Sequence, residues 1–314
     1  MRRGRILSMA LVGALVLGAC SGGSASKQPQ DRPSPSTAAS DARGPSGGDR
    51  SSLTGRIVFD NHDDVWSINA DGTDLTRLTD STGLDFDPSW SPDGTQIAYR
   101  HDEGNESEIW VMNADGSEPH RLGRGISPAW SPDGSRIAYA GPGDPPCPPT
   151  GGPLCTGISI MNADGSGQHR VPNTDVGEYP SWSPDGKRIV FNSLLTGDHL
   201  MYIVDVDGSN VVDLSFVGEG WQVAWSPDGR SILFASSRDH LGQPGTHDVY
   251  VMRPDGSAVR RLTHNRAYTP AWSPDGEHIV FSAPGLFIMD PDGSDVRALH
   301  TPGVGETSLP DWTD

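Results

Sequence analysis

The sequence predicts an all-β fold, a six-bladed β-propeller whose blades are four-stranded antiparallel sheets. Three observations predict it. The pentapeptide WSPDG occurs five times, beginning at Trp90, Trp130, Trp182, Trp225 and Trp272. An Asp-Gly pair recurs six times in step with it, and 39 Gly and 27 Pro residues indicate dense turns. Repeats of this length predict stacked units of short strands that each need neighbours.

Each repeat contains four short apolar stretches, which we interpret as strands. The first ends in the Trp-Ser of the pentapeptide, and the second follows it, as in QIAYR at 96–100. The third precedes the Asp-Gly pair, as in IWVMNA at 109–114, and the fourth follows that pair, as in LTRLT at 75–79. Short or alternating apolar runs bounded by Gly, Pro and Asp are typical of strands.

The repeated pentapeptide is explained by turn chemistry. In Ser-Pro-Asp-Gly the proline sets φ at the second position, a Ser or Asp side chain caps the first, and Gly accepts a positive φ at the end. Asn-Ala-Asp-Gly does the same between the third and fourth strands. The motif therefore predicts a hairpin at the same place in every unit. Its tryptophan, at a fixed strand position, is expected to pack between blades.

The ends of the folded domain, residues 55–314, predict how the ring closes. The first recognisable stretch, RIVFD at 56–60, is a second strand that lacks a first. LPDWT at 309–313 contains a degenerate sixth copy of the motif and supplies the missing strand. Closure of this kind removes free sheet edges, which otherwise invite aggregation.

These motifs resemble a known family. W-S-P-D-G followed by I-A-Y/F and then V-M-N-A-D-G is similar to the TolB-type propeller repeat, and the resemblance covers residues 55–314. It implies a closed propeller. TolB itself, as the family is known, is a soluble periplasmic protein with an extra amino-terminal α/β domain, and this chain departs from that pattern before residue 55.

The amino-terminal segment predicts export and anchoring. Residues 1–19 combine a basic start with a short apolar run, as in a secretory signal peptide. Leu17-Gly18-Ala19-Cys20 resembles a bacterial lipobox, which implies cleavage before Cys20 and attachment of lipid to its thiol, on the outer side of the cell membrane. Residues 20–54 contain almost no large aliphatic side chains, so we expect a disordered linker.

In an up-and-down blade, the tight turns share one face and the other connections share the opposite one, which we call the long-loop face. Two long connections, 141–157 and 236–248, belong to the long-loop face. We expect this face to bind the partner, because loops on a rigid scaffold carry function.

Cys147 and Cys155 lie in the first connection and predict a disulfide in an oxidising compartment. A two-Cys metal site is the alternative.

The long-loop face also gathers candidate site residues. Five acids lie near the starts of inner strands and are candidates for a Ca²⁺ or Mg²⁺ site in the central channel: Asp85, Asp87, Glu178, Glu219 and Glu306. Ordinary solvated acids are the alternative. The candidate ligand contacts are His62, His101, Arg238, His240, His247 and Trp221, the last in a blade-to-blade loop. Solvated histidines are the default interpretation of the imidazoles.

The net charge of −18 counts against nucleic-acid binding. The alternative interpretation is that this charge only keeps the protein soluble. The chain has no G-x-S-x-G and no H-E-x-x-H motif. We therefore expect a monomeric, lipid-anchored module, not an enzyme, that binds an envelope protein, peptide or glycan. The alternative is a metal-dependent, lyase-like enzyme acting on an acidic polysaccharide, for which Arg100, Arg124, Arg238 and Arg266 are candidates for a basic patch.

Replacing Cys20 with Ala is expected to release the exported protein from the membrane. The acyl chains contribute about 0.8 kcal/mol per buried CH₂, and the variant has no thiol to carry them. Fractionation of the cells measures the effect, with Cys147→Ala as the control that keeps its anchor. Sedimentation of the Cys20→Ala protein with membranes would contradict the lipidation hypothesis.

Overall fold

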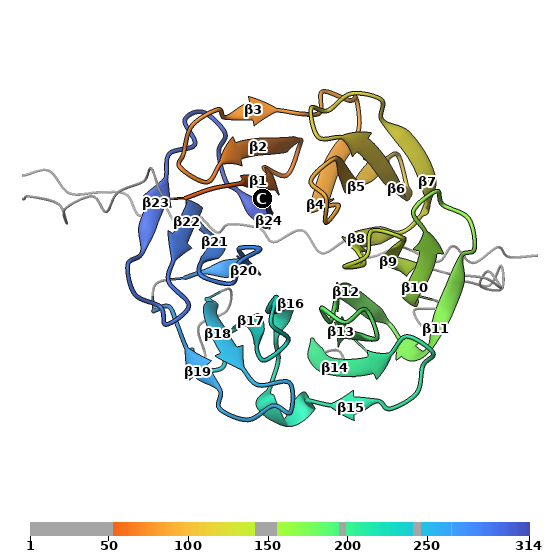
Figure 1. The fold of residues 1–314 in the computed structure, drawn as a ribbon, viewed down its shortest axis with the longest axis vertical. Helices are drawn as coiled ribbons and strands as arrows, with labels where there is room; N and C mark the ends of the chain where they lie inside the picture. Colours follow the sequence, from red (N-terminus) through yellow and green to blue (C-terminus); the bar gives the residue numbers. More distant parts are fainter. Residues whose placement is uncertain (1–52, 142–155, 195–198, 241–245, 265) are drawn as a thin grey trace, which may run out of the picture. The chain divides into compact units, whose positions relative to one another are not determined.

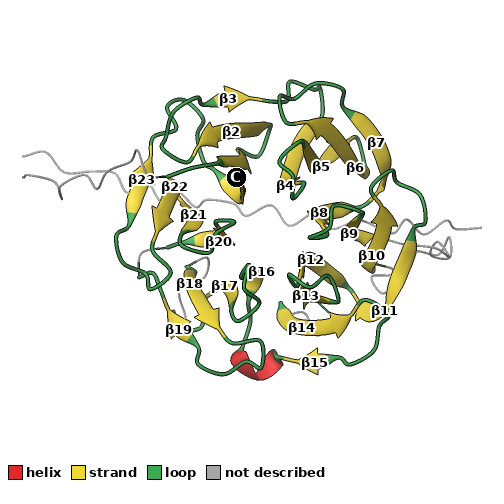
Figure 2. Ribbon diagram, in the orientation of Figure 1, coloured by secondary structure: helices red, strands yellow, loops and turns green. Residues whose placement is uncertain are grey.

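The fold is a ring of six sheets around a central channel (Figure 1, Figure 2). It comes from a computed structural model that describes residues 53–141, 156–194, 199–240, 246–264 and 266–314. The sheets lie in a compact unit that spans Gly48–Asp314. Each sheet is antiparallel and has four strands, so the predicted six-bladed propeller is confirmed.

In each blade the strands are named in spatial order, from the strand that lines the channel to the outermost one. Blade 1 contains β24 (Ser308–Thr313), β1 (Arg56–Asp60), β2 (Val65–Asn69) and β3 (Thr76–Arg77). Blades 2 and 3 contain β4 (Leu84–Trp90), β5 (Gln96–Glu103), β6 (Glu106–Asn113), β7 (His120–Arg124), β8 (Ile126–Trp130), β9 (Arg136–Gly141), β10 (Gly157–Asn162) and β11 (His169–Asp175). Blades 4 to 6 contain β12 (Gly177–Trp182), β13 (Arg188–Ser193), β14 (Leu200–Asp205), β15 (Val212–Asp213), β16 (Trp221–Trp225), β17 (Ile232–Ser236), β18 (Asp248–Met252), β19 (Arg260–Arg261), β20 (Tyr268–Trp272), β21 (Ile279–Ala283), β22 (Gly285–Met289) and β23 (Arg297–Leu299).

The hydrophobic core lies between blades. The second and third strands of each blade bury side chains on both faces, as in the run Val58–Asp60 of β1. Each of the six buried clusters in the described residues joins two neighbouring blades. One of them, for example, packs Ile57 and Trp312 of blade 1 against Val280 and Ile288 of blade 6. No blade therefore buries its apolar surface without its neighbours.

The repeated tryptophans belong to this packing, as predicted. Five of them are between 5% and 8% exposed: Trp90, Trp130, Trp182, Trp225 and Trp312. The guanidinium of Arg136 in blade 3 lies 4.7 Å from the ring centroid of Trp182 in blade 4. Arg188 in blade 4 lies over Trp225 in blade 5 at 5.0 Å. Each ring is thus covered by the preceding blade, a contact that combines burial with cation–π attraction.

The pentapeptide forms the predicted turn. In the first copy, the Gly94 N–H donates to the Ser91 carbonyl (2.9 Å), and the Ser91 hydroxyl donates to Asp93 Oδ1 (2.6 Å). Gly94 has a φ of +68°, which a residue with a Cβ rarely adopts. The same Ser-to-Asp bond recurs in the other four copies, so the motif closes a hairpin in each blade.

The carboxyl-terminal strand closes the ring. β24 pairs antiparallel with β1, with Ile57 opposite Trp312 and Arg56 opposite Thr313. The Trp312 indole N–H donates to the Thr54 carbonyl (3.1 Å). Asp311 accepts the backbone N–H of Trp90 in blade 2 at 2.7 Å. β24 therefore completes blade 1 and also contacts the blade beside it.

Helix is a minor component of the described residues. A single turn of 3₁₀ helix, η3 (Ser215–Val217), connects β15 to β16. Among the residues that the structure describes, no helix has the length and apolar character needed to cross a membrane.

Replacing Trp312 with Ala is expected to lower the free energy of unfolding by about 3–5 kcal/mol, because it opens a cavity in a buried cluster at the closing strand. Denaturant unfolding measures the loss. Trp66→Ala in β2, where the ring is only partly buried, is the control and should cost less. Equal losses in the two variants would show that the closing strand carries no special share of the stability.

Candidate functional site

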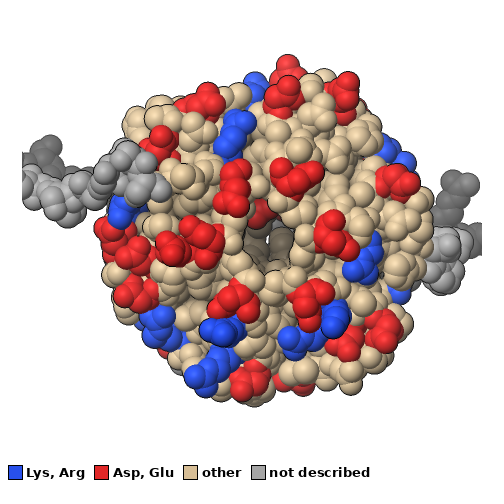
Figure 3. Space-filling view, in the orientation of Figure 1, with Lys and Arg blue, Asp and Glu red and all other residues tan. Residues whose placement is uncertain are grey.

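The central channel widens into a funnel at the long-loop face, and this funnel is the candidate site. Its cavity is about 710 Å³ and is lined by inner strands and by connections that include His62, Pro284 and Glu306. A second cavity of about 520 Å³ occupies the other end and is lined by the Trp-Ser-Pro segments. Figure 3 shows one face of the ring, hollowed at its centre, with acidic side chains distributed around the hollow.

A ring of six residues, one from each inner strand, marks the boundary between the two cavities, and we call it the collar. Each member lies three residues before the tryptophan position of its repeat and has a φ between 47° and 52°: Asp87, Ser127, Tyr179, Gln222, Thr269 and Leu309. All but Ser127 line both cavities. Strand pairing slips at each of these positions, so each inner strand has a β-bulge there.

Hydrogen bonds between blades hold part of the collar. The Ser127 N–H and hydroxyl both donate to Asp87 Oδ2 at 3.1 Å. The Leu309 N–H donates to Thr269 Oγ1 (3.3 Å), and the Asp87 N–H donates to Asp60 Oδ2 (3.4 Å). Left-handed backbone on a residue other than Gly costs on the order of 1–3 kcal/mol. These bonds offset that cost across blades 6, 1, 2 and 3.

The polar half of the funnel contains two buried carboxyl groups. Asp60 is fully buried at the end of β1 and accepts the Ser308 hydroxyl of β24 at 2.6 Å. Burial and, to a smaller extent, the neighbouring Asp87 carboxylate raise the pKa of Asp60 to about 6, although the hydrogen bond from Ser308 opposes them. Burial also raises the pKa of Asp87, opposed by the positive charge of Arg100. Arg100 is itself held by Asp102, through an Nε–Oδ1 bond of 2.8 Å.

The opposite half of the funnel is aromatic. Trp221, expected in a loop, is instead the first residue of β16, and its ring centroid lies 5.8 Å from that of His247. The ring centroid of His247 lies 5.4 Å from that of Tyr268, the first residue of β20. His199 packs against the Trp221 ring. Burial lowers the pKa of His247, so this imidazole is neutral at pH 7.

The five predicted acids do not converge on one point. Of these, Asp87 and Glu306 line the funnel. Asp85 is buried and contacts His101 Nδ1 at 2.7 Å, and Glu219 accepts a bond from the Ser237 hydroxyl. Glu178 is half-buried near Asp87 and Arg100, and burial raises its pKa. Within the described ranges, no three His, Cys, Asp or Glu side chains are placed to hold a metal ion, so the residues present do not fit the predicted cation site.

The predicted ligand contacts divide into two groups. His62, His247 and Trp221 line the funnel, as does Arg266. His101 lies in β5, where it binds Asp85 and packs edge-on against Trp110. Of the four arginines of the expected basic patch, Arg100 and Arg124 are ion-paired with acids of their own blade. Cys20, Cys147 and Cys155 lie outside the described residues.

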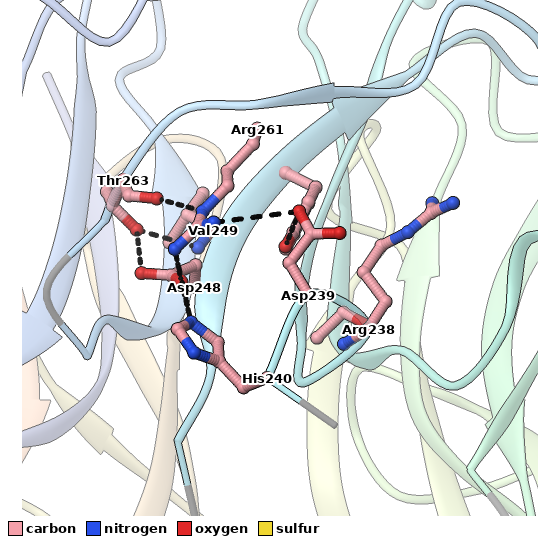
Figure 4. A network of polar contacts seen from close by, with 9 residues as sticks. Arg238, Asp239, His240, Asp248, Val249, Arg261 and Thr263 are labelled. Atoms are coloured by element: carbon pink, nitrogen blue, oxygen red, sulfur yellow. Dashed lines mark hydrogen bonds and ion pairs between the residues drawn. The ribbon is translucent and has the colours of Figure 1, made fainter. Parts of the chain in front are cut away.

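Arg238 and His240 belong to a separate polar network in blade 5. Figure 4 shows His240, Arg261 and Thr263 turned toward Asp248. Arg261 Nη2 donates to Asp248 Oδ2 (2.5 Å), the Thr263 hydroxyl donates to Asp248 Oδ1 (3.1 Å), and His240 contacts the same carboxylate. Arg238 lies over the Tyr250 ring at 5.7 Å. Blade 1 repeats part of this arrangement: Arg77 donates to Asp64, and the Thr79 hydroxyl accepts the Val65 N–H as that of Thr263 accepts the Val249 N–H. The recurrence indicates a structural role in the blade.

Asp60, Tyr268 and the collar residues other than Asp87 were not predicted from the sequence. The collar positions lie at a fixed offset from each tryptophan, and that offset is the signal that would have found them. Asp60 gives no such signal, because the equivalent second-strand positions hold Arg100, Ala140 and Ser282. Its role depends on the closing strand, which is 248 residues away in sequence.

Comparison with known proteins identifies the fold and the repeat. The chain matches the family described as TolB beta propeller domain over residues 46–216 and 123–243. A TolB homolog of Chlorobium luteolum is 40% identical over 43 residues, which are 14% of this chain and 10% of that protein. The aligned segment thus spans a small part of that relative's length.

Solved structures match over most of this chain. TolB from Acinetobacter baumannii superposes with a TM-score of 0.69 at 22% identity, over 83% of this chain and 67% of that chain. A putative TolB from Agrobacterium tumefaciens gives 0.61 at 23% identity, over 79% and 89%. Enzymes also match, among them an oligogalacturonate lyase from Vibrio parahaemolyticus (TM-score 0.52, 14% identity, 76% and 72%). At these identities the likeness concerns the fold.

Asp60 is expected to make stability depend on pH. Its pKa is about 6 in the folded chain against 3.8 as an ordinary Asp, so the folded state keeps a proton that the unfolded state loses. Stability from this group therefore falls by about 2 kcal/mol as pH rises from 4 to 7.

Asp60→Asn removes this dependence, so the variant should gain stability relative to the parent chain between pH 4 and pH 7. Urea unfolding at both pH values measures the difference, and the exposed Asp63→Asn is the control. An unchanged difference between parent and variant at pH 4 and pH 7 would contradict the raised pKa.

Proposed function

Because the chain belongs to the TolB beta propeller domain family, we propose that it is a binding protein of the cell envelope. Its funnel on the long-loop face recognises an envelope protein, peptide or glycan. The single observation that supports this function is the funnel itself, a preformed concave site with one aromatic and one polar wall. Ligand sites in proteins commonly combine apolar walls with a few placed polar groups in this way.

The rigidity of the scaffold supports a recognition role. The funnel walls are inner strands whose blades are joined by six interblade cores. A site built on such elements is ordered before the partner arrives, which lowers the entropy cost of binding. The rim residues, by contrast, come from connections such as those that contain His62, Arg266 and Glu306.

The proposed location is the outer side of the cell membrane, through lipid on Cys20. A signal-like segment, a lipobox-like tetrapeptide and a polar spacer before the propeller support it. The spacer would let the funnel reach partners away from the membrane surface. The net charge of −18 disfavours anionic lipid and nucleic acid as partners and is compatible with an envelope protein, peptide or glycan.

The alternative function, metal-dependent cleavage of an acidic polysaccharide, has no feature of the described residues in its favour. Those residues bring together no metal-binding group of three, and Arg100 and Arg124 are ion-paired rather than clustered. We therefore propose the binding function alone.

Charge reversal at the funnel rim is expected to reduce partner capture. The full-length anchored chain is used as bait in cross-linking of the envelope, and the recovery of each captured component is compared with that of Arg266→Glu. Arg266 is exposed and lines the funnel, so the change should lower recovery at least severalfold.

Lys187→Glu makes the same charge change on the opposite, tight-turn face and is the matched control. Capture that falls equally in both variants would reflect net charge alone. Capture of nothing by the parent chain, or capture unaffected by Arg266→Glu, would contradict the proposed site.

A further inference from the structure

The aromatic wall of the funnel is a continuous row of three rings from two adjacent blades. Trp221 and His247 belong to blade 5 and Tyr268 belongs to blade 6, with neighbouring centroids 5.8 Å and 5.4 Å apart. His199 covers part of Trp221 and holds it in place. All three rings of the row line the cavity. Neighbouring ring planes are inclined to each other by 74° and 57°. The row is therefore an uncharged, ridged aromatic surface that a ligand in the channel can contact one ring at a time.

Planar polar side chains line the same cavity as this row: Arg100 from blade 2, Glu306 from the connection that precedes β24, and Gln222 from blade 5 itself. Arg100 lies over the Phe86 ring at 5.3 Å and is bonded by Asp102, so its guanidinium has a fixed orientation. Glu306 is exposed at the rim, and Gln222 of the collar borders the cavity from below. Donors and acceptors are therefore placed around an aromatic row, an arrangement suited to a ligand with an apolar face and many hydroxyl groups.

The inner strands are poorly suited to binding an extended peptide by its main chain. Peptides that add to a sheet edge need a regular row of backbone N–H and C=O groups. Here each inner strand is bulged at the collar, and proline follows the collar residue in five of six blades: Pro88, Pro128, Pro180, Pro270 and Pro310. Proline has no N–H to donate, so the edge is interrupted. Recognition by side chains is favoured instead.

The charges of the funnel select against an acidic ligand. Four carboxyl groups line it, those of Asp60, Asp87, Asp102 and Glu306, against two guanidinium groups, those of Arg100 and Arg266. Arg100 is already paired with Asp102. A polyanion would meet an excess of carboxyl groups in the funnel, whereas an uncharged ligand would not be repelled.

We propose that the funnel binds an uncharged oligosaccharide, with a pyranose ring stacked on one ring of the row formed by Trp221, His247 and Tyr268. This inference rests on the proposed binding function and names the chemical class of its ligand. The ring's C–H face meets the aromatic row, and its hydroxyls meet Arg100, Gln222 and Glu306. The cavity of about 710 Å³ is within the size range of small-molecule sites.

Isothermal titration calorimetry on the purified chain tests the proposal with four tetrasaccharides. Tetra-N-acetylchitotetraose, called chitotetraose below, and cellotetraose are uncharged, tetragalacturonate is acidic, and the fully deacetylated chitosan tetramer is cationic. We expect at least one uncharged tetramer to bind, and to bind at least tenfold tighter than either charged one. Tighter binding of either charged tetramer would overturn the proposal, as would no measurable heat with both uncharged tetramers at millimolar concentration.

Variants locate the site. Trp221→Ala and Tyr268→Ala should each weaken binding at least tenfold, while Trp221→Phe, which keeps a stacking ring, should restore most of it. Phe216→Ala, at a ring that is 69% exposed in η3 on the outer rim, is the control and should bind as the parent chain does. Thermal melting verifies that each variant is folded, and unchanged affinity in folded Trp221→Ala would place the ligand elsewhere.

The outcome is separable from that of the partner-capture experiment. If an envelope protein is captured through the funnel and chitotetraose and cellotetraose do not displace it, the oligosaccharide proposal fails and the binding function stands. If a bound tetrasaccharide displaces the captured component, both stand. If neither a tetrasaccharide nor an envelope component depends on the funnel, both fail.

Discussion

The pairing of β24 with β1 is the contact on which the rest of the structure depends. The apolar clusters of this chain lie between blades rather than within them, so every blade needs a neighbour on each side. An open array would split one of these cores and leave two sheet faces without partners. The terminal strand prevents this, because Trp312 completes the cluster between blades 6 and 1 while Asp311 contacts blade 2. The channel and its funnel exist only because the ring is closed.

Closure also explains why the polar half of the funnel lies where it does. At the blade 1 position of the collar, Leu309 has no side chain that can accept the N–H of Asp87, and Asp60 accepts it instead. Asp60 also accepts a hydrogen bond from the hydroxyl of Ser308 in the closing strand. The place where the two ends of the domain meet is therefore also a place where carboxyl groups are buried beside the channel. The Asp60 carboxyl therefore both joins the closing strand to β1 and contributes charge to the wall of the funnel.

Most of the fold could be predicted from the sequence, because its determinants are local and repeated. Ser91, Asp93 and Gly94 encode their turn within four residues, and Trp90 recurs at a fixed strand position. The site could be predicted only in part. Asp87, Trp221 and His247 were identified on the face that forms the funnel, but His101, Asp85 and His240 have partners that spacing does not reveal. Tyr268 looked like an ordinary strand residue, and its contribution appears only when blades 5 and 6 are placed side by side.

The collar has a consequence for how such a protein can diversify. Asp, Ser, Tyr, Gln, Thr and Leu all take the same left-handed backbone at equivalent positions, so the blade imposes this conformation and the side chain does not. A substitution there changes the chemistry of the channel while the surrounding geometry is kept. The side chains at these six positions, one per blade, can therefore vary independently while the backbone of the blades stays the same. Related chains can thereby acquire new ligand preferences through a handful of mutations without having to rebuild the ring.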